Sequence, residues 1–299
     1  MATVPANAPP SAALAEGYTR SHIPTMAYRF YGLVAMDAGE ASRIGSELME
    51  LLRLDTYPVA VRLVRRGEGV PEGVRRPSKA LGCRITLCQA FGMTRRYGWT
   101  IGVSPEECAC NVAKLLFGWS TLEHRDYYVD FLLDAGFFRS RDAAAKAAEY
   151  DFSNCVLPRG ECEAILTSPL NRCKIEPDVA LVHGNPTQVF ILVHGYLSGV
   201  GGDLKISYTG RHASCGHGVI QTYLSRRPNI VIPDEGDCVL AATEKDELIF
   251  AAPVDLLPDI LEGVKAVFSR KLIRYPTPYY IKFEPVFPEP FRRLGERLR

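Results

Sequence analysis

Apolar residues recur at helical spacing in several segments of the first half of the chain. After Asp37, the residues Ile44, Leu48, Leu51 and Leu52 follow one another at intervals that place them on one side of a helix. This pattern predicts an amphipathic helix from about Asp37 to Leu52. Further helices are predicted over residues 76–95, from 104 onward, over 127–133 and over 142–150.

One helix start has a specific signature. Ser104-Pro105-Glu106-Glu107 combines a capping serine, a proline at the first helical position and a glutamate three residues after the cap. The motif predicts a helix that begins at Ser104 and carries Cys108 and Cys110 in its first turns.

Short apolar runs between turn residues predict strands, and these are more frequent in the second half. Val59–Val64 follows the turn Thr56-Tyr57-Pro58 and predicts a half-buried strand. The other predicted strands cover residues 99–103, 179–182, 205–208, 229–232, 238–242 and 248–252, and a last amphipathic helix covers 258–268. We therefore expect an α+β fold with a mixed or mostly antiparallel sheet, packed helices, a helical N-terminal half and a strand-richer C-terminal half.

Prolines set the expected limits of the folded part. Pro5, Pro9, Pro10 and Pro24 prevent a regular start, so residues 1–26 are predicted to be an arm or disordered leader. Because neither a repeat nor a clear linker follows, residues 27–299 are predicted to form a single compact domain. Its proline-rich end, residues 276–290, is expected to wrap the surface.

Composition narrows the class of protein. No apolar run reaches the 18 or so residues of a transmembrane helix, and 35 Lys+Arg against 34 Asp+Glu leave a net charge of +1. We therefore expect neither a membrane span nor a nucleic-acid partner. The aromatic-rich segments 28–31 and 279–283 would suit a homodimer.

Nine cysteines are the most informative feature of the composition. The chain starts without the basic residues and apolar stretch of a signal peptide, so a reducing, cytoplasmic location is expected. The thiols are then free, bound to metal or catalytic.

Four of these cysteines form the series Cys83-x4-Cys88-x19-Cys108-x-Cys110. Thiolates select zinc, copper(I) or iron–sulfur clusters, although the spacing fits neither a zinc knuckle nor a plant-type cluster throughout. Cys83 and Cys88 can share a site only if the helix ends between them, and Cys108 and Cys110 only at an irregular helix start. Buried thiols without metal remain the alternative.

A second group, Cys155-x6-Cys162-x10-Cys173, lies in sequence that resembles loops, where ligands can converge. No histidine lies within this segment, so a fourth ligand would have to come from elsewhere in the chain. The role of these three cysteines stays open.

A glycine-rich segment leads into Ser214-Cys215, after which an apolar pattern predicts a helix. A thiol at a helix start is activated, and His212 and His217 lie close by in sequence. Cys215 with either histidine could therefore act as a nucleophile and its base, or contribute to a metal site.

The chain resembles the ArCR family, domain of unknown function 169, over roughly residues 40–270. The likeness rests on an ordered series of segments: Pro58–Arg62, Gly82–Phe91, Cys108, Pro169-Leu170, Asn185–Gln188, Cys215 and Asp246–Pro253. The resemblance implies a cytoplasmic α+β domain and transfers no activity. Cys110, Cys155 and Cys162 make this chain unusually rich in cysteine for the family.

These observations lead to one functional hypothesis and two alternatives. We expect an iron–sulfur protein, with a 4Fe-4S cluster held by Cys83, Cys88, Cys108 and Cys110, and with Cys215 as the substitute ligand. It would act in electron transfer with a redox partner protein, or as an oxidoreductase or lyase on a small molecule. The alternatives are a metal-free cysteine enzyme that uses Cys215 with His217 or His212, and a zinc-stabilised accessory protein.

Overall fold

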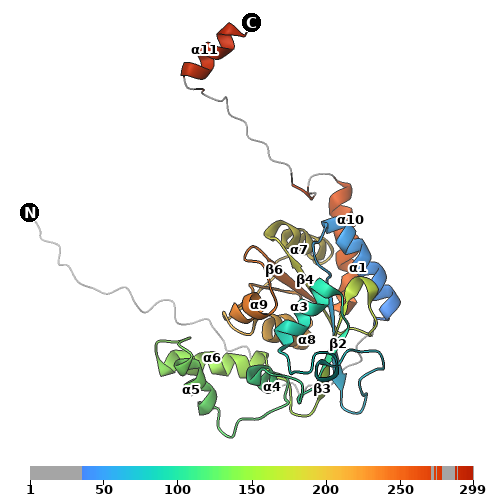
Figure 1. The fold of residues 1–299 in the computed structure, drawn as a ribbon, viewed down its shortest axis with the longest axis vertical. Coiled ribbons are helices and arrows are strands. Elements are labelled where there is room, and N and C mark those ends of the chain that lie inside the picture. The colour runs from blue at the N-terminus through green and yellow to red at the C-terminus, as the bar shows by residue number, and fades with distance from the viewer. Residues whose placement is uncertain (1–35, 271–272, 274, 278–286, 288, 299) are drawn as a thin grey trace, which may run out of the picture. The chain divides into compact units, whose positions relative to one another are not determined.

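A computed structural model describes residues 36–270, 273, 275–277, 287 and 289–298 (Figure 1). The arm predicted for residues 1–26, both aromatic segments and most of 276–290 lie outside the described residues, so the predicted division into arm and single domain stays a prediction. The α-helices are α1 (Ala38–Leu52), α2 (Pro77–Ala80), α3 (Leu87–Tyr97), α4 (Asn111–Leu116), α5 (Asp126–Asp134), α6 (Arg141–Asn154), α7 (Pro186–Val200), α8 (Thr222–Ser225), α9 (Glu235–Leu240), α10 (Leu257–Ser269) and α11 (Glu289–Arg297). Two 3₁₀-helices, η1 (Leu170–Arg172) and η3 (Val254–Leu256), and one π-helix, η2 (Ala213–Gln221), complete the helices of the described chain.

A six-stranded sheet forms the centre of this part of the chain. Its strands are β1 (Val59–Arg65), β2 (Ile101–Val103), β3 (Cys162–Pro169), β4 (Val179–Gly184), β5 (Asn229–Val231) and β6 (Leu248–Pro253). They lie in the order β2-β3-β1-β4-β6-β5, and every neighbouring pair is antiparallel. The predicted α+β class with a mostly antiparallel sheet is confirmed.

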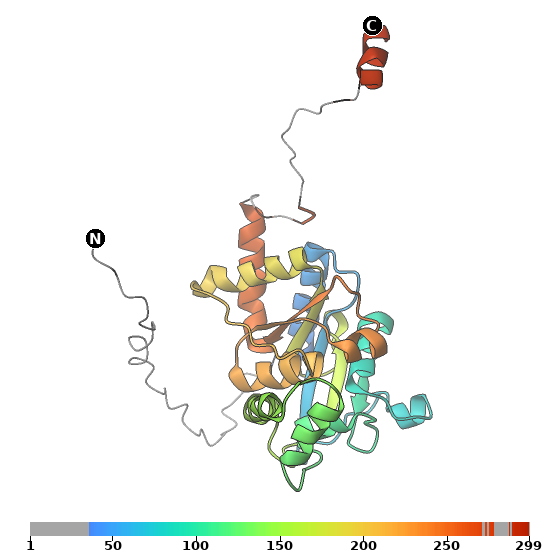
Figure 2. The ribbon, with the colours of Figure 1, turned by 90° about the vertical axis from the view of Figure 1, so that its left-hand side faces the viewer.

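The main hydrophobic core lies between one face of the sheet and the helices α1, α7 and α10. On α1, the predicted apolar positions Ile44, Leu48 and Leu52 are all buried, and Asp37 caps the helix. Figure 2 shows α7 and α10 crossing on this side of the sheet. They approach closely because Gly263 has no side chain: a Cβ there would lie 2.0 Å from the carbonyl oxygen of Gly195.

The helices α3, η2 and α8 pack against strands from the other side of the sheet. Side chains alternate between faces along a strand, so Ala60 and Val64 of β1 enter the main core while Val61 and Leu63 point toward this second layer. The first turns of α3 and η2 carry the cysteines considered below.

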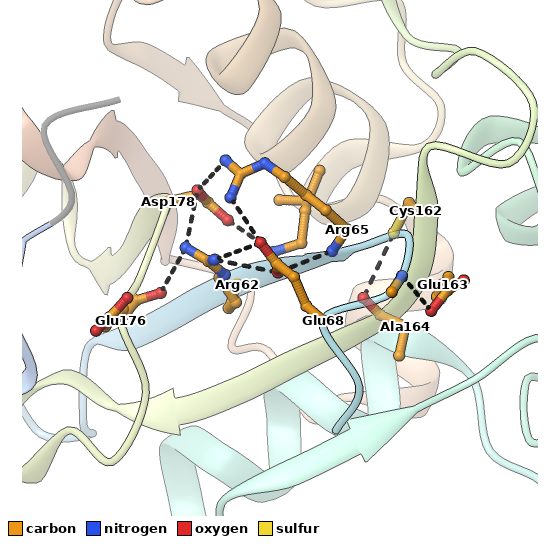
Figure 3. A network of polar contacts seen from close by, with 10 residues as sticks. Arg62, Arg65, Glu68, Cys162, Glu163, Ala164, Glu176 and Asp178 are labelled. Carbon is orange, nitrogen blue, oxygen red and sulfur yellow. Dashed lines mark hydrogen bonds and ion pairs between the residues drawn. The ribbon is translucent and has the colours of Figure 1, made fainter. Parts of the chain in front are cut away.

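A polar network joins β1 to Asp178, in the segment that leads into the neighbouring strand β4 of the sheet (Figure 3). Asp178, which is 1% exposed, accepts a hydrogen bond of 2.8 Å from the backbone N–H of Leu63 and lies 3.3 Å from Arg65 and 3.7 Å from Arg62. Burial raises the pKa of Asp178, although the Leu63 N–H and both arginines oppose the rise. The network joins β1 to the segment that leads into β4, so these charges serve the fold.

The helix predicted over residues 76–95 is interrupted. Helix α2 ends at Ala80, and α3 begins at Leu87 after Thr86, which forms a capping box with Gln89. The break lies between Cys83 and Cys88, which is the condition under which those two thiols could share a site.

The helix predicted from Ser104 ends after a single turn, in which the N–H groups of Glu107 and Cys108 donate to the Ser104 carbonyl at 3.0 Å. The backbone of Ile85 pairs with this segment instead: its N–H donates to the carbonyl of Glu107 at 3.0 Å, and its carbonyl accepts from Ala109 N–H at 2.8 Å. These bonds hold the chain out of the helix from Cys108 to Cys110, so α4 begins only at Asn111, with Cys110 as its N-cap.

Three smaller predictions also fail. Residues 205–208 form no strand, and residues 238–242 lie in and after α9, which Asp234 starts by accepting a hydrogen bond from Asp237 N–H. The segment interpreted as loop around Cys155 and Cys162 instead contains the C-terminal cap of α6 and the start of β3.

A buried histidine on β4 makes stability depend on pH. Burial, reinforced by Arg95 and Arg96, lowers the pKa of His183 well below 6.5, so this ring stays neutral in the fold. In the unfolded chain His183 gains a proton as the pH falls below about 6.5, and this proton uptake stabilises the unfolded state. The contribution of His183 to the free energy of unfolding, which is present above that pH, is therefore lost at up to about 1.4 kcal/mol per pH unit. Asp237 titrates in the opposite sense in this range, so the two variants are compared: between pH 6.5 and 5.5, urea unfolding should show a change in the free energy of unfolding that is about 1 kcal/mol less favourable in the wild type than in His183→Leu, and equal changes would contradict the assignment.

Candidate functional site

Three of the nine thiols lie on elements that pack around the π-helix η2, which contacts both α3 and α4. Cys88 lies in the first turn of α3, Cys110 caps α4, and Cys215 lies in the first turn of η2. Cys215 interacts electrostatically with both other thiols, and Cys88 with Cys110. We call these three residues the cysteine site.

The thiols of the cysteine site differ in exposure. Cys215 is 8% exposed, whereas Cys88 and Cys110 are half-buried. Burial, the neighbouring thiols and two aspartates raise the pKa of Cys215 and of Cys88 well above the ordinary value. Both thiols are therefore held protonated unless a cation compensates for the charge of the thiolate.

Two aspartates border the cysteine site and start the π-helix. Asp234 accepts a hydrogen bond of 2.9 Å from Ala213 N–H, and Asp237 accepts one of 3.2 Å from Ser214 N–H. Asp237 Oδ1 and the Ser214 hydroxyl are buried without a partner. Burial and the adjacent Asp234 carboxylate raise the pKa of Asp237 to about 6. The Ser214 side chain opposes this rise in the pKa of Asp237, so the two buried groups lie next to each other.

The spacing of the sulfurs bears on what they could bind. Within the described ranges, only Asp151, Cys155 and His217 bring three ligand atoms within 4.8 Å of one another. The three sulfurs of the cysteine site are therefore spread more widely than this. Two thiolates on one zinc, at about 2.3 Å each, lie at most about 4.6 Å apart. In this arrangement the three sulfurs are therefore too far apart for all of them to bind a single zinc ion.

The other two ligands in the predicted set lie differently. Cys83 is exposed between α2 and α3. Cys108 is buried, interacts electrostatically with Cys110, and its thiol donates to the Cys110 carbonyl at 3.5 Å. The structure therefore groups Cys215, the predicted substitute, with Cys88 and Cys110.

Both histidines near Cys215 in sequence bond elsewhere. His212 has φ 52° and places Nε2 2.6 Å from the Tyr128 hydroxyl. His217 Nε2 lies 2.8 Å from the Thr209 hydroxyl, and Nδ1 lies 2.6 Å from Gln221 Oε1. Neither is hydrogen-bonded to Cys215 in the part of the chain that the structure describes.

The three cysteines of the second group separate. The Cys162 thiol donates to Ala164 O at 3.4 Å and the Cys173 thiol to Ile175 O at 3.2 Å, as buried thiols of a core do. Cys155 instead lies beside Asp151 and His217.

The sequence interpretation missed Asp151. Its spacing of four from Cys155 places both on one face of a helix, which is the available signal. That signal was hidden because the segment around Cys155 was interpreted as loop.

Comparisons with known proteins agree with the resemblance noted in the sequence. Among the described helices, none is long and apolar enough to cross a membrane. An uncharacterised protein of Methanocaldococcus jannaschii is 26% identical over 237 residues, which cover 77% of this chain and 96% of that protein. No solved structure matches the chain. Residues 47–263 match the family described as uncharacterised ArCR, so the chain belongs to this family, DUF169.

Proposed function

We propose that this protein binds an iron–sulfur cluster, of the 4Fe-4S type, through Cys88, Cys110 and Cys215. The observation that carries the proposal is the packing of η2, with Cys215 in its first turn, against α3 and α4, whose starts carry Cys88 and Cys110, beside a buried carboxylate oxygen that has no hydrogen-bond partner. It keeps two ligands of the set expected from sequence and replaces Cys83 and Cys108 by Cys215.

The charge and spacing of the site favour a cluster. Cys88 and Cys215 lie at the N-terminal ends of helices, whose partial positive charge stabilises thiolates and an anionic cluster. In a cluster each cysteine binds a different iron, so the sulfurs lie farther apart than they do around one ion. Cation binding would also release the thiol protons that burial retains in the metal-free protein.

The fourth iron would have a ligand other than these cysteines. Asp237 Oδ1 is the buried oxygen available beside the site. A cluster with such an iron supplies electron transfer or Lewis acidity, and both reactions remain within the proposal.

The surroundings suit a redox partner protein or a small molecule as the second reactant. Cys88 and Cys110 are half-buried, so a cluster there would lie near the surface. All nine cysteines are free, which agrees with a reducing, cytoplasmic location. A homodimer stays part of the proposal on the aromatic segments of the sequence alone.

A metal-free cysteine enzyme has weaker support. The raised pKa of Cys215 disfavours the nucleophilic thiolate, and His212 and His217 bond to Tyr128, Thr209 and Gln221. A nucleophile needs a base within hydrogen-bond reach, which this arrangement does not supply.

Anaerobic purification of the full chain tests the proposal. Iron, zinc and acid-labile sulfide would be measured together with a visible absorption spectrum. We expect about four irons and four sulfides per chain and a broad visible band. A colourless, folded protein without iron or sulfide, before and after anaerobic reconstitution, would overturn the cluster.

A further inference from the structure

A second group of ligand atoms lies on another side of the π-helix. Asp151 and Cys155, at the end of α6, face His217 of η2, and all three residues are 0% exposed. One ligand atom of each lies within 4.8 Å of the others, and Cys155 Sγ is 3.9 Å from His217 Nδ1. Because His217 follows Cys215 by two residues on a helix, the two side chains project from different sides.

One oxygen of the Asp151 carboxylate is unused. Asp151 Oδ2 accepts hydrogen bonds from Arg211 at 2.8 Å and from the Tyr128 hydroxyl at 3.0 Å, and His212 lies 3.7 Å away. Oδ1 is buried and has no partner. Arg211 and His212 therefore lie beside Oδ2, and Oδ1 is available to a ligand.

Both nitrogens of the His217 ring have polar neighbours. Nδ1–H donates to Gln221 Oε1 at 2.6 Å, so Nε2 accepts from the Thr209 hydroxyl at 2.8 Å; in the other tautomer Nε2 would donate to Thr209, as the second nitrogen of a metal-binding histidine usually does. Gln221 Oε1, 2.6 Å from Nδ1, adds an oxygen beside the same point.

From this geometry we infer a second metal site, in which one divalent zinc ion is bound by Asp151 Oδ1, Cys155 Sγ and His217 Nδ1. Oxygen, sulfur and nitrogen from three side chains, with Gln221 Oε1 as the fourth donor, match the ligand types and coordination number of zinc.

The protons and charges of the binding step balance. The Cys155 S–H bond breaks, its proton leaves to solvent, and a sulfur–zinc bond forms. On His217 the Nδ1 proton is released and Nε2 takes one up, so that Nε2–H then donates to Thr209. Thiolate and carboxylate supply two negative charges for the divalent ion, while Arg211 stays paired with Oδ2.

Such an ion would join α6 to the π-helix. A π-helix of this length is rare, and π-helical segments occur frequently at functional sites. Since Asp151, Cys155 and His217 are buried and Gln221 is partly buried, four protein donors would close the site, as in structural zinc sites. It does not depend on the cluster proposed above, because the two sites have no ligand in common.

Zinc analysis and X-ray absorption of the full-length wild type test this site directly. The protein would be expressed with zinc supplementation and purified without chelator. We expect about one zinc per chain, with one sulfur and otherwise nitrogen or oxygen neighbours. Cys155→Ser should lose the zinc or its sulfur neighbour, whereas Cys173→Ser, another buried cysteine, should keep both.

The outcomes separate this site from the cysteine site. Absence of zinc from the folded wild type, a zinc without sulfur, or a sulfur-rich zinc that is lost in Cys215→Ser would each overturn the inference. The X-ray absorption spectrum of the wild type tests the inference even if Cys155→Ser fails to fold, because it shows whether the zinc has one sulfur neighbour. Iron and sulfide should persist in a folded Cys155→Ser, so the cluster and the zinc site can fail independently.

Discussion

Cys215→Ser is expected to lower the iron and sulfide retained after anaerobic reconstitution by at least about tenfold, because it removes the buried one of the three proposed cysteine ligands. Serine keeps the size of the side chain but is a poor ligand for iron in a cluster. Iron and sulfide per chain, with the visible band, measure the loss. Cys88→Ser and Cys110→Ser should act in the same direction.

Matched controls separate ligand loss from damage to the core. Cys162 and Cys173 are buried, and their thiols donate to backbone carbonyls away from the cysteine site, so their serine variants should keep the cluster. Cys108→Ser distinguishes the two ligand sets: it should keep the cluster if Cys215 is the third ligand. A folded Cys215→Ser with wild-type iron and sulfide would refute the assignment of this residue.

Glu247→Ala is expected to lower the free energy of unfolding by about 3–5 kcal/mol. Its partner Arg95, on α3, has a side chain that is 0% exposed and forms two hydrogen bonds with Glu247, at 2.5 and 2.7 Å. Two further nitrogens of Arg95 are buried without a partner. Burial lowers the pKa of Arg95 and Glu247 opposes this, so removal of the carboxylate leaves an unpaired buried cation.

The double variant Arg95→Met/Glu247→Leu tests the reason for that loss. Replacing both charges with apolar groups of similar volume removes the desolvation cost, and less than half of the single-variant loss is expected. Urea unfolding of both variants at one pH gives the comparison. A single-variant loss below about 1 kcal/mol would mean that water reaches Arg95 and that the pair contributes as a surface ion pair does.

Local sequence determined much of the secondary structure. The spacing of Ile44, Leu48 and Leu52 and the cap at Asp37 placed α1 almost to the residue, and short apolar runs located β1, β4 and β6. These signals act within a few residues, through side-chain periodicity and capping hydrogen bonds. They therefore do not depend on the rest of the fold.

Tertiary contacts overrode the local signal where a distant segment offered better bonds. Ser104–Glu107 has the residues of a helix start, yet the backbone of Ile85 pairs with the residues that follow and keeps them extended. An isolated capping motif contributes only about 1 kcal/mol, which two backbone hydrogen bonds in a packed setting can offset.

The sequence alone determined that this protein is a cysteine-rich α+β protein of the ArCR type, and that its thiols carry the chemical interest. Only the tertiary structure decided which thiols meet. Cys88, Cys110 and Cys215 are brought to one region because η2 packs against both α3 and α4, which are distant in sequence, and tertiary packing likewise brings His217 to Asp151 and Cys155. Tertiary packing decides which residues from distant segments share a site. Spacing along the chain predicts which side chains lie together only within one helix or strand.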